Sequence, residues 1–295
     1  MRPIKIVTDS CSDLCKELRD KHGIEYVKMN TVHNEKETPA SLDWEYFSAK
    51  ELYDLMRNGE RITTTQVPAA EFTEKFTKLT DEGFDVIYIS CSGALSGSVN
   101  TGKIVAKDIM AKNPEAKIAC IDPLMACIGE GMIAVKAAEL AEDGKSFDEV
   151  VAYIEENKLR MNQFCTVNTL DYLKRAGRVK ASSAFFGNLF GVKPVIISDA
   201  KGQNTAIKKV KGRLASMDEI VNLLNDAMQG EEDRRVFVGH ADCPQEEVDY
   251  LANKVKEVIK DAEVTVGYIG PVIGASVGPG AVVVYGWGKK VELEG

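Results

Sequence analysis

The first half of the chain repeats one pattern three times: a short apolar run, a polar turn, and a segment with helical spacing. The apolar runs are Ile4–Val7, Phe84–Ile89 and Lys117–Ile121, and each ends at serine, threonine or aspartate residues. Strand, turn and helix in this order are typical of a parallel sheet that carries helices on both faces. Ligands of such sheets bind beyond the carboxyl ends of the strands, so we expect the three polar turns to meet at one crevice.

The pattern changes near residue 160. After Phe164–Val167 the turns become rich in glycine, and the apolar runs on either side of Asp199–Gly202 are typical of a hairpin. A length of 295 residues fits two domains. We therefore predict an α/β protein with two α/β domains: residues 1–160 with the parallel sheet, and residues 161–295 with a mixed sheet and its own helices.

Composition argues against several classes of function. The formal net charge is −8, which disfavours generic binding to nucleic acid. No apolar run reaches the roughly 18 residues that a membrane-spanning helix needs. The first residues do not have the pattern of a signal peptide, so we expect a cytoplasmic protein. The seven cysteines are an odd number, so we expect reduced thiols, and we predict no metal site and no cofactor.

The densest polar turn is Ser90–Ser98, which holds four serines and two glycines. Glycines let a ligand approach the backbone, and free N–H groups at a helix start attract anions, so a carboxylate or phosphate is the expected ligand. A nucleophilic serine would need a Gly-x-Ser-x-Gly turn and a base, but Ser96 is flanked by Ala94 and Ser98. A hydrolase or phosphoryl-transfer enzyme that uses Ser92 or Ser96 remains an alternative.

Five further segments suggest a functional role, and a purely structural role is the alternative for most of them. A threonine hydroxyl of Thr63–Gln66 is a candidate donor to an anion, or simply part of a turn. The basic residues of Lys174–Lys180 and Lys208–Arg213 form either a local positive surface or a solvated face. The glycines and prolines of Gly270–Gly280 suggest a rigid loop along which a ligand packs. The phenylalanines of Ser182–Gly191 either wall an apolar tunnel or belong to the core.

Taken together and in order, these motifs resemble the DegV family of fatty-acid-binding proteins, which includes the FakB-type subunits of bacterial fatty acid kinase. The resemblance implies two α/β domains that exchange a strand, and a long-chain fatty acid in an apolar tunnel between them. It also implies a lipid-binding carrier and not an enzyme: the carboxylate is presented to an ATP-dependent kinase, which forms acyl-phosphate for phospholipid synthesis. The matching stretches are Thr8–Ser10, Thr64–Gln66, Ser92–Gly97, Asp122, Gly129–Gly131, Thr169–Arg178, Lys193–Pro194, Lys211–Arg213 and Gly270–Gly280.

The resemblance maps the carboxylate ligands of the family onto Thr64 and Ser92. It maps the basic residues that are associated with the kinase or with phosphate onto Arg178 and Arg213. The full set of ligand-binding residues that we predict on this basis is Thr64, Ser92, Gly93, Ser96, Gly274 and Ser276.

Three positions depart from the family pattern. Gly93 stands where the family has the second serine of a pair, Ser276 replaces a frequent histidine, and Pro123 follows Asp122 where serine is usual. The first two changes remove polar groups near the headgroup. A carrier of another amphipathic anion is therefore a second alternative to the fatty-acid carrier.

Overall fold

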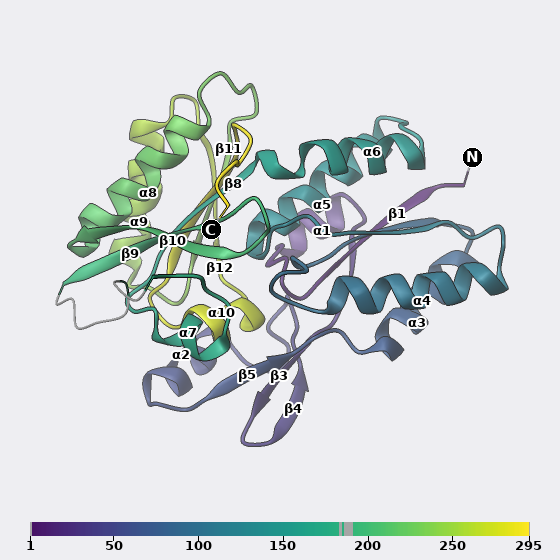
Figure 1. Ribbon diagram of the computed structural model, residues 1–295, viewed down its shortest axis with the longest axis horizontal. Coiled ribbons are helices and arrows are strands. Elements are labelled where there is room, and N and C mark those ends of the chain that lie inside the picture. The colour runs from purple at the N-terminus through teal and green to yellow at the C-terminus, as the bar shows by residue number, and fades with distance from the viewer. Residues whose placement is uncertain (1, 183–184, 186–190, 295) are drawn as a thin grey trace.

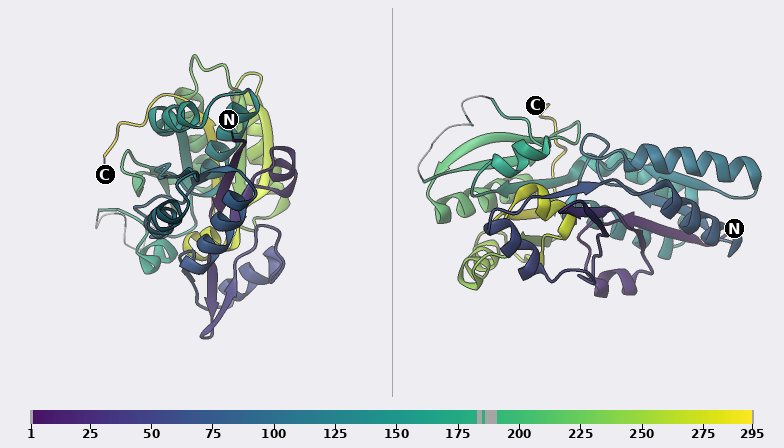
Figure 2. Two further views of the ribbon diagram at one scale, coloured as in Figure 1. Left: turned by 90° about the vertical axis from the view of Figure 1, so that its right-hand side faces the viewer. Right: turned by 90° about the horizontal axis from the view of Figure 1, so that it is seen from below.

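Three sheets of four, six and three strands organise the computed structural model, which describes residues 2–182, 185 and 191–294 (Figure 1). The four-stranded sheet comes from the first half of the chain and the six-stranded sheet from the second half. The two large sheets lie at opposite ends of the long axis of the molecule (Figure 2). The predicted α/β fold class is confirmed.

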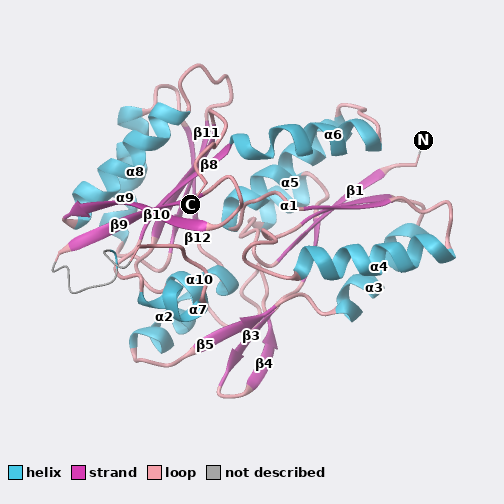
Figure 3. Ribbon diagram, in the orientation of Figure 1, coloured by secondary structure: helices cyan, strands magenta, loops and turns pink. Residues whose placement is uncertain are grey.

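The four-stranded sheet is parallel throughout and has the order β2-β1-β6-β7. Its strands carry the three predicted apolar runs, and β6 is buried along its whole length. Helices α3 and α4 pack on one face, and α5 and α6 pack on the other (Figure 3). The elements are β1 (Ile4–Asp9), α1 (Lys16–Lys21), β2 (Glu25–Val27), α3 (Ala69–Asp81), β6 (Asp85–Ile89), α4 (Ser98–Lys112), β7 (Ile118–Ile121), α5 (Cys127–Glu142) and α6 (Phe147–Asn157).

The six-stranded sheet is mixed, as predicted, with the order β10-β9-β8-β13-β11-β12. The β11–β12 pair is parallel, whereas the pairs from β10 to β11 are antiparallel. The predicted hairpin is β9 with β10, and α8 and α9 pack on one face of the sheet. The elements are β8 (Met161–Thr166), β9 (Val192–Ser198), β10 (Asn204–Lys211), α8 (Arg213–Ala227), β11 (Arg235–His240), α9 (Gln245–Val258), β12 (Glu263–Tyr268) and β13 (Val282–Trp287).

A three-stranded antiparallel sheet with the order β4-β3-β5 projects from the first half. Its strand β5 carries Thr64, so the threonine cluster that we expected in a turn lies on a strand. Helix α10 packs against β3 and β5 of this sheet and against helices α2 and α7. These elements are β3 (Asn30–His33), β4 (Lys36–Pro39), α2 (Ala49–Arg57), β5 (Ile62–Thr65), α7 (Asp171–Ala176) and α10 (Pro271–Val277).

A helix of the second half packs on the first half, whereas we expected a strand to be exchanged between the two. Within the described residues, every sheet takes its strands from one side of residue 160. Helix α10 crosses instead: it belongs to the second half but packs on α2, β3 and β5 of the first, and it lies beside α2 in Figure 1. The expectation of a loop over Gly270–Gly280 is therefore wrong for its first part. Pro271 begins the helix, where its fixed φ and missing N–H carry no cost.

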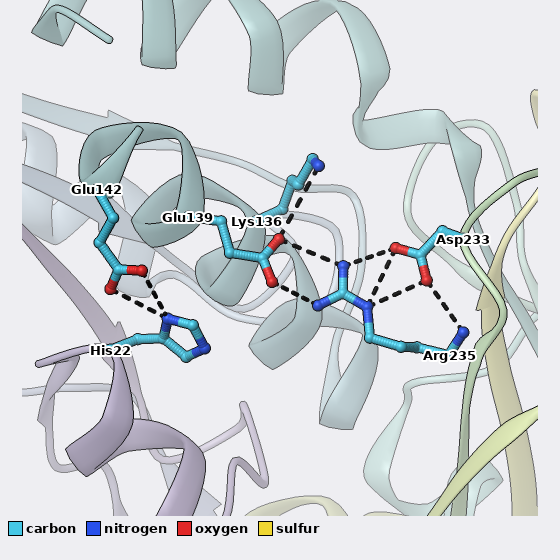
Figure 4. Close-up of polar contacts among 6 residues, drawn as sticks. All are labelled: His22, Lys136, Glu139, Glu142, Asp233 and Arg235. Atoms are coloured by element: carbon cyan, nitrogen blue, oxygen red, sulfur yellow. Dashed lines mark hydrogen bonds and ion pairs between the residues drawn. The ribbon is translucent and has the colours of Figure 1, made fainter. Parts of the chain in front are cut away.

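The two halves share a hydrophobic core and several polar contacts. One cluster of buried residues includes Ile6 and Ile133 of the first half and Tyr285 of the second. Arg235 of β11 lies between Asp233 and Glu139 of α5, with Nη1 donating to Glu139 Oε1 at 2.6 Å (Figure 4). The predicted boundary falls between the short 3-10 helix η1 (Lys158–Arg160) and β8, and the division into two domains stays a prediction.

Candidate functional site

A cavity of about 190 Å³ lies between the carboxyl ends of the N-terminal strands and one face of the six-stranded sheet. This volume is more than ten times the roughly 10–15 Å³ that one water occupies, so it has room for a sizeable ligand. The first half contributes the turns after β1 and β6 and the start of α5. The second half contributes alternate residues of β8 and β13 and one face of α10. The apolar lining includes Met29, Leu95, Ala126, Leu173, Ile196, Ile269, Val272, Ile273, Val277 and Val283.

Thiols form part of the cavity wall. Cys11, Cys91, Cys127 and Cys165 line the cavity, and all four are free and buried. Burial raises the pKa of Cys127 well above its usual value and that of Cys165 to about 12. These thiols are therefore neutral at neutral pH, and a neutral cysteine behaves as a small hydrophobic side chain. The wall thus offers an apolar environment without a thiolate nucleophile.

The polar end of the cavity is formed by Thr64, Ser276 and Arg178. These three residues also line a second cavity of about 160 Å³, so the first cavity opens toward the second at this end. Neither the Thr64 nor the Ser276 hydroxyl has a hydrogen-bond partner among the described residues, so both are available to a ligand. An anionic headgroup at this end would meet two hydroxyl donors and one guanidinium.

Arg178 also ties the two halves together at the polar end. Its Nε donates to the carbonyl of Leu95 at 3.2 Å, and its Nη1 donates to the carbonyl of Ala176. Leu95 belongs to the serine-rich turn of the first half and lines the same cavity. The guanidinium is thus held at the cavity while it keeps further N–H donors for an anion. Of the two arginines predicted to contact a partner or a phosphate, Arg178 and Arg213, Arg178 is the one that lines the cavity.

Ser92 is placed outside the cavity lining, contrary to the role that the family resemblance suggests. Its side chain is fully buried, and its Oγ donates to the carbonyl of Gly202 at 2.8 Å and accepts from the N–H of Ala94 at 3.2 Å. Gly202 lies in the turn between β9 and β10. Ser92 therefore joins the two halves beside the cavity, and its hydroxyl is already engaged.

We expect Ser92→Ala to destabilise the fold more than it weakens ligand binding. The substitution leaves the buried Gly202 carbonyl without its donor, which costs about 1–3 kcal/mol in the free energy of unfolding. Denaturant unfolding and titration with a long-chain fatty acid measure the two effects, and Thr77→Ala at an exposed position of α3 is the control. A tenfold or greater loss of affinity with unchanged stability would instead make Ser92 a headgroup ligand.

Gly93 and Gly274 serve close packing and not the cavity wall. A Cβ at Gly93 would lie 2.5 Å from Asp122 Oδ2, which already accepts from the Gly93 N–H at 3.1 Å. A Cβ at Gly274 would lie 2.4 Å from the Tyr53 hydroxyl. Neither distance leaves room for a side chain, so Gly93 fixes the serine-rich turn and Gly274 lets α10 approach α2. Neither residue lines the first cavity.

Ser96 lines the cavity but has no base beside it. Its Oγ lies 3.0 Å from Ser98 Oγ, which in turn accepts from the N–H of Val67. His240, the last residue of β11, has its ring centroid 4.3 Å from that of Tyr268 with the two rings tilted, and it does not line the cavity. Ser92 donates to a backbone carbonyl. The described residues thus give neither serine the imidazole or carboxylate partner that nucleophilic catalysis needs.

Arg213 lies away from both cavities. Arg213 lies in the first turn of α8 and Glu247 lies on α9. The Arg213 Nε and Nη2 donate to Glu247 Oε2 at 3.0 and 2.8 Å. The ion pair is half-buried within the second half of the chain. The expectation that Arg213 joins Arg178 at the opening is therefore not met, because its charge is already balanced by Glu247.

The aspartate at the end of β1, Asp9, holds two turns in place. Asp9 Oδ1 accepts from the N–H of Cys11 at 2.8 Å, and Oδ2 accepts from the N–H of Cys91 at 2.9 Å. Asp9 therefore positions the two turns that bring these thiols to the cavity wall. The described residues contain no cluster of three or more acidic, histidine or cysteine side chains suited to a metal ion.

Asp13 is a buried acid that sequence reasoning missed. It adopts a left-handed backbone conformation with φ 47°, and its buried carboxyl faces the Cys127 thiol and the Gly270 N–H, which only partly offset the effect of burial on its pKa. A Cβ at Gly270 would lie 2.2 Å from Asp13 Oδ1, so the carboxyl group lies against the start of α10. Burial raises its pKa to about 7. Nothing in the local sequence distinguishes it from a surface aspartate of the same turn.

Much of the apolar segment Ser182–Gly191, which we considered as a tunnel wall, lies outside the described residues. Phe185 is described, and it is partly buried with the Lys209 ammonium 5.2 Å from its ring centroid. Across residues 2–182, 185 and 191–294, no helix combines the length and the apolar character needed to cross a membrane.

Comparisons with known proteins agree on one family. The DegV family model, described as a family of uncharacterised proteins, matches residues 3–286. A DegV domain-containing protein of Clostridium perfringens is 32% identical over 99% of this chain and 100% of its own length. Two solved structures are similar: a fatty-acid-binding DegV family protein from Thermus thermophilus and the fatty acid binding protein DegV of Bacillus subtilis. Each is 27% identical and covers 98% of this chain and 100% of its own, with TM-scores of 0.86 and 0.83.

Proposed function

This chain belongs to the DegV family, and we propose that it binds a long-chain fatty acid in the 190 Å³ cavity between its two halves. The acyl chain lies along the apolar and thiol wall. The carboxylate accepts hydrogen bonds from Thr64, Ser276 and Arg178. Solved relatives described as fatty-acid-binding proteins support this assignment.

The observation that carries the proposal is the polarity of the cavity from end to end. Its wall is mostly apolar, although the neutral side chains of Ser96, Gln163 and Asn204 also line it, whereas its end offers two unengaged hydroxyls and a guanidinium. Burying one methylene contributes about 0.8 kcal/mol, so the chain supplies most of the affinity. Hydrogen bonds to a carboxylate contribute about 1.5–3 kcal/mol each before the entropy of ordering the ligand is subtracted. The polar end therefore chiefly sets the direction in which the fatty acid enters.

Native mass spectrometry of the purified protein tests this proposal. We expect a long-chain fatty acid to co-purify, or added palmitate or oleate to bind one molecule per chain. In Thr64→Val combined with Ser276→Ala, affinity is expected to fall about tenfold, since two hydroxyl donors are lost while the apolar wall stays. Lys256→Ala on α9 is the control. A protein that neither carries nor takes up any long-chain acid would overturn the assignment.

We further propose that the chain is a carrier without catalysis of its own, which presents the carboxylate to an ATP-dependent fatty acid kinase subunit. Among the residues that the structure describes, no base lies beside Ser92 or Ser96, which favours a carrier over a hydrolase. ATP alone should leave the bound acid unchanged, whereas ATP with a kinase subunit should yield acyl-phosphate. Arg178→Ala should lower the rate of that reaction more than it lowers fatty acid content. Turnover by the chain alone would favour the enzyme alternative.

A further inference from the structure

A further cavity of about 120 Å³ lies between the two halves of the chain and shares no lining residue with the first two cavities. It is formed by α1 and α5 of the first half and by β11 and β12 of the second, and we call it the α1–β12 cavity. Its volume is roughly ten times that of one water, so it has room for a small organic molecule. Part of its lining is apolar and packs in or against the core, namely Leu18, Met132, Val135 and Phe237.

The arginine that lines this cavity is already neutralised. Arg235 Nη2 and Nε donate to Asp233 at 2.6 and 3.1 Å, and Nη1 donates to Glu139 at 2.6 Å (Figure 4). Two carboxylates thus surround one guanidinium, so Arg235 is not available to bind an anion. Its role at the cavity is to tie β11 to α5 and so to hold together the two halves that enclose it.

His22 offers an unengaged nitrogen at the cavity. Its side chain is only 5% exposed, and its Nδ1 lies 3.1 and 3.2 Å from the two carboxylate oxygens of Glu142 (Figure 4). Because a carboxylate only accepts hydrogen bonds, Nδ1 carries the proton of this contact. In the neutral ring Nε2 then has a lone pair, and none of the described residues donates to it. Since the imidazole lines the cavity, Nε2 is an acceptor for a ligand there.

Two opposite charges line the cavity at exposed positions. Lys21 of α1 is one and Glu263 of β12 is the other, and within residues 2–182, 185 and 191–294 neither side chain makes a hydrogen bond or an ion pair. The Thr265 hydroxyl, two positions further along β12, also has no partner in this part of the chain. Opposite charges that line one cavity without pairing with each other can bind the two charged groups of a zwitterion.

We propose that the α1–β12 cavity binds an α-amino acid with an apolar side chain. Its ammonium group donates to the Glu263 carboxylate and to His22 Nε2, its carboxylate accepts from the Lys21 ammonium, and its side chain packs on the apolar lining. A fatty acid would leave Glu263 and His22 without a donor, and a simple amine would leave Lys21 without an acceptor. Because the cavities share no lining residue, this site does not depend on the fatty-acid assignment.

Calorimetric titration with four small molecules tests the proposal. L-Leucine carries all three features, whereas isoamylamine lacks the carboxylate, 4-methylpentanoic acid lacks the ammonium group and glycine lacks the side chain. The chain is first saturated with palmitate, so that none of the four enters the first cavity. L-Leucine should bind one molecule per chain, and each of the other three should bind about fivefold or more weakly. A chain that takes up no palmitate can be titrated in the same way.

Two substitutions at the exposed charges should change the preference among these molecules. In Glu263→Gln, affinity for L-leucine should fall about fivefold, while affinity for 4-methylpentanoic acid changes less than about twofold. In Lys21→Gln, affinity for L-leucine should fall by a similar factor, while affinity for isoamylamine stays the same. Glu246→Gln and Lys256→Gln remove the same two charges at exposed positions of α9, and they should leave each affinity unchanged.

Thr265→Trp tests the location. Thr265 lies beside Phe237 on the paired strands, so an indole there should cover the apolar lining and abolish L-leucine binding while palmitate binding persists. Unchanged L-leucine binding in this variant would overturn the proposal. So would a wild-type chain without saturable L-leucine binding up to about 10 mM, or an equal loss for all four molecules in Glu263→Gln. Failure to bind palmitate bears on the fatty-acid assignment alone.

Discussion

Ile273→Trp is expected to abolish fatty acid binding while the fold is retained. Ile273 lies on α10, is only partly buried, and lines the first cavity together with Val277 of the next helical turn. An indole at this position would occupy space that we assign to the acyl chain. Excluding about four methylenes at about 0.8 kcal/mol each weakens binding by about 3 kcal/mol, which is more than a hundredfold. Native mass spectrometry and titration with palmitate measure the loss.

The same substitution should not unfold the protein, because the ring enters an existing cavity and need not displace packed side chains. We expect a melting temperature equal to or above that of the ligand-free wild-type chain. Ile273→Leu conserves volume and is the matched control, with binding within about threefold of wild type. Full occupancy by palmitate in Ile273→Trp would show that the acyl chain lies elsewhere, and the cavity would then lose its assigned role.

The cavity wall shows which parts of such a site a sequence can reveal. The apolar runs and the turns after them are local signals, so the parallel sheet and the meeting of its strand ends could be predicted. The thiol wall could not, because Cys11 and Cys91 reach the cavity only through the bonds that Asp9 makes to both turns. The sequence places these cysteines 80 positions apart. Only the pairing of β1 with β6 makes them neighbours.

Ser92 and α10 show the same limit. The family pattern identified Ser92 as important, but the direction of its hydroxyl depends on Gly202, which lies 110 positions later in the chain. Glycine-rich composition favoured a loop over residues 270–280, whereas tertiary contacts with α2 allow a helix there. Thr64 and Ser276 line the first cavity, and they also line the second because of how the two halves pack.

Asp13 underlies the second large effect that we expect, which concerns stability. The Asp13 carboxyl is buried at the start of α10, and its pKa is raised from 3.8 to about 7 by burial. The unfolded chain therefore releases this proton at a lower pH than the folded chain does. Between those two pKa values the unfolded state binds fewer protons, so stability falls as pH rises. The contribution of protonated Asp13 to the free energy of unfolding is complete below about pH 4 and is lost above about pH 7.

We expect Asp13→Asn to remove this pH dependence and to stabilise the protein in mildly alkaline solution. A shift of about three pKa units corresponds to about 4 kcal/mol, so the variant should exceed wild type by up to about this amount near pH 8. Near pH 3 the two should be alike, because Asp13 is then mostly protonated in both the folded and the unfolded state. Asparagine is suited to the position, since it tolerates a left-handed backbone better than most residues. Urea unfolding at several pH values measures the difference.

Asp122→Asn is the control for Asp13→Asn. It shows whether the gain in stability comes from the burial of Asp13 or from the removal of any acidic residue near a strand end. Asp122 accepts hydrogen bonds from the N–H groups of Gly93 and Leu124, so Asp122→Asn should destabilise the turns at neutral pH and bring no gain at alkaline pH. A stability difference between Asp13→Asn and wild type that stays constant from about pH 4 to about pH 8 would mean that Asp13 is ionised throughout.

Because Asp13 lies against α10, which carries Ile273 and Ser276, the raised pKa of Asp13 also predicts that α10 is held most firmly in acidic solution. Amide hydrogen exchange of α10 at the two pH values should therefore show slower opening, after correction for intrinsic rates, at the lower pH.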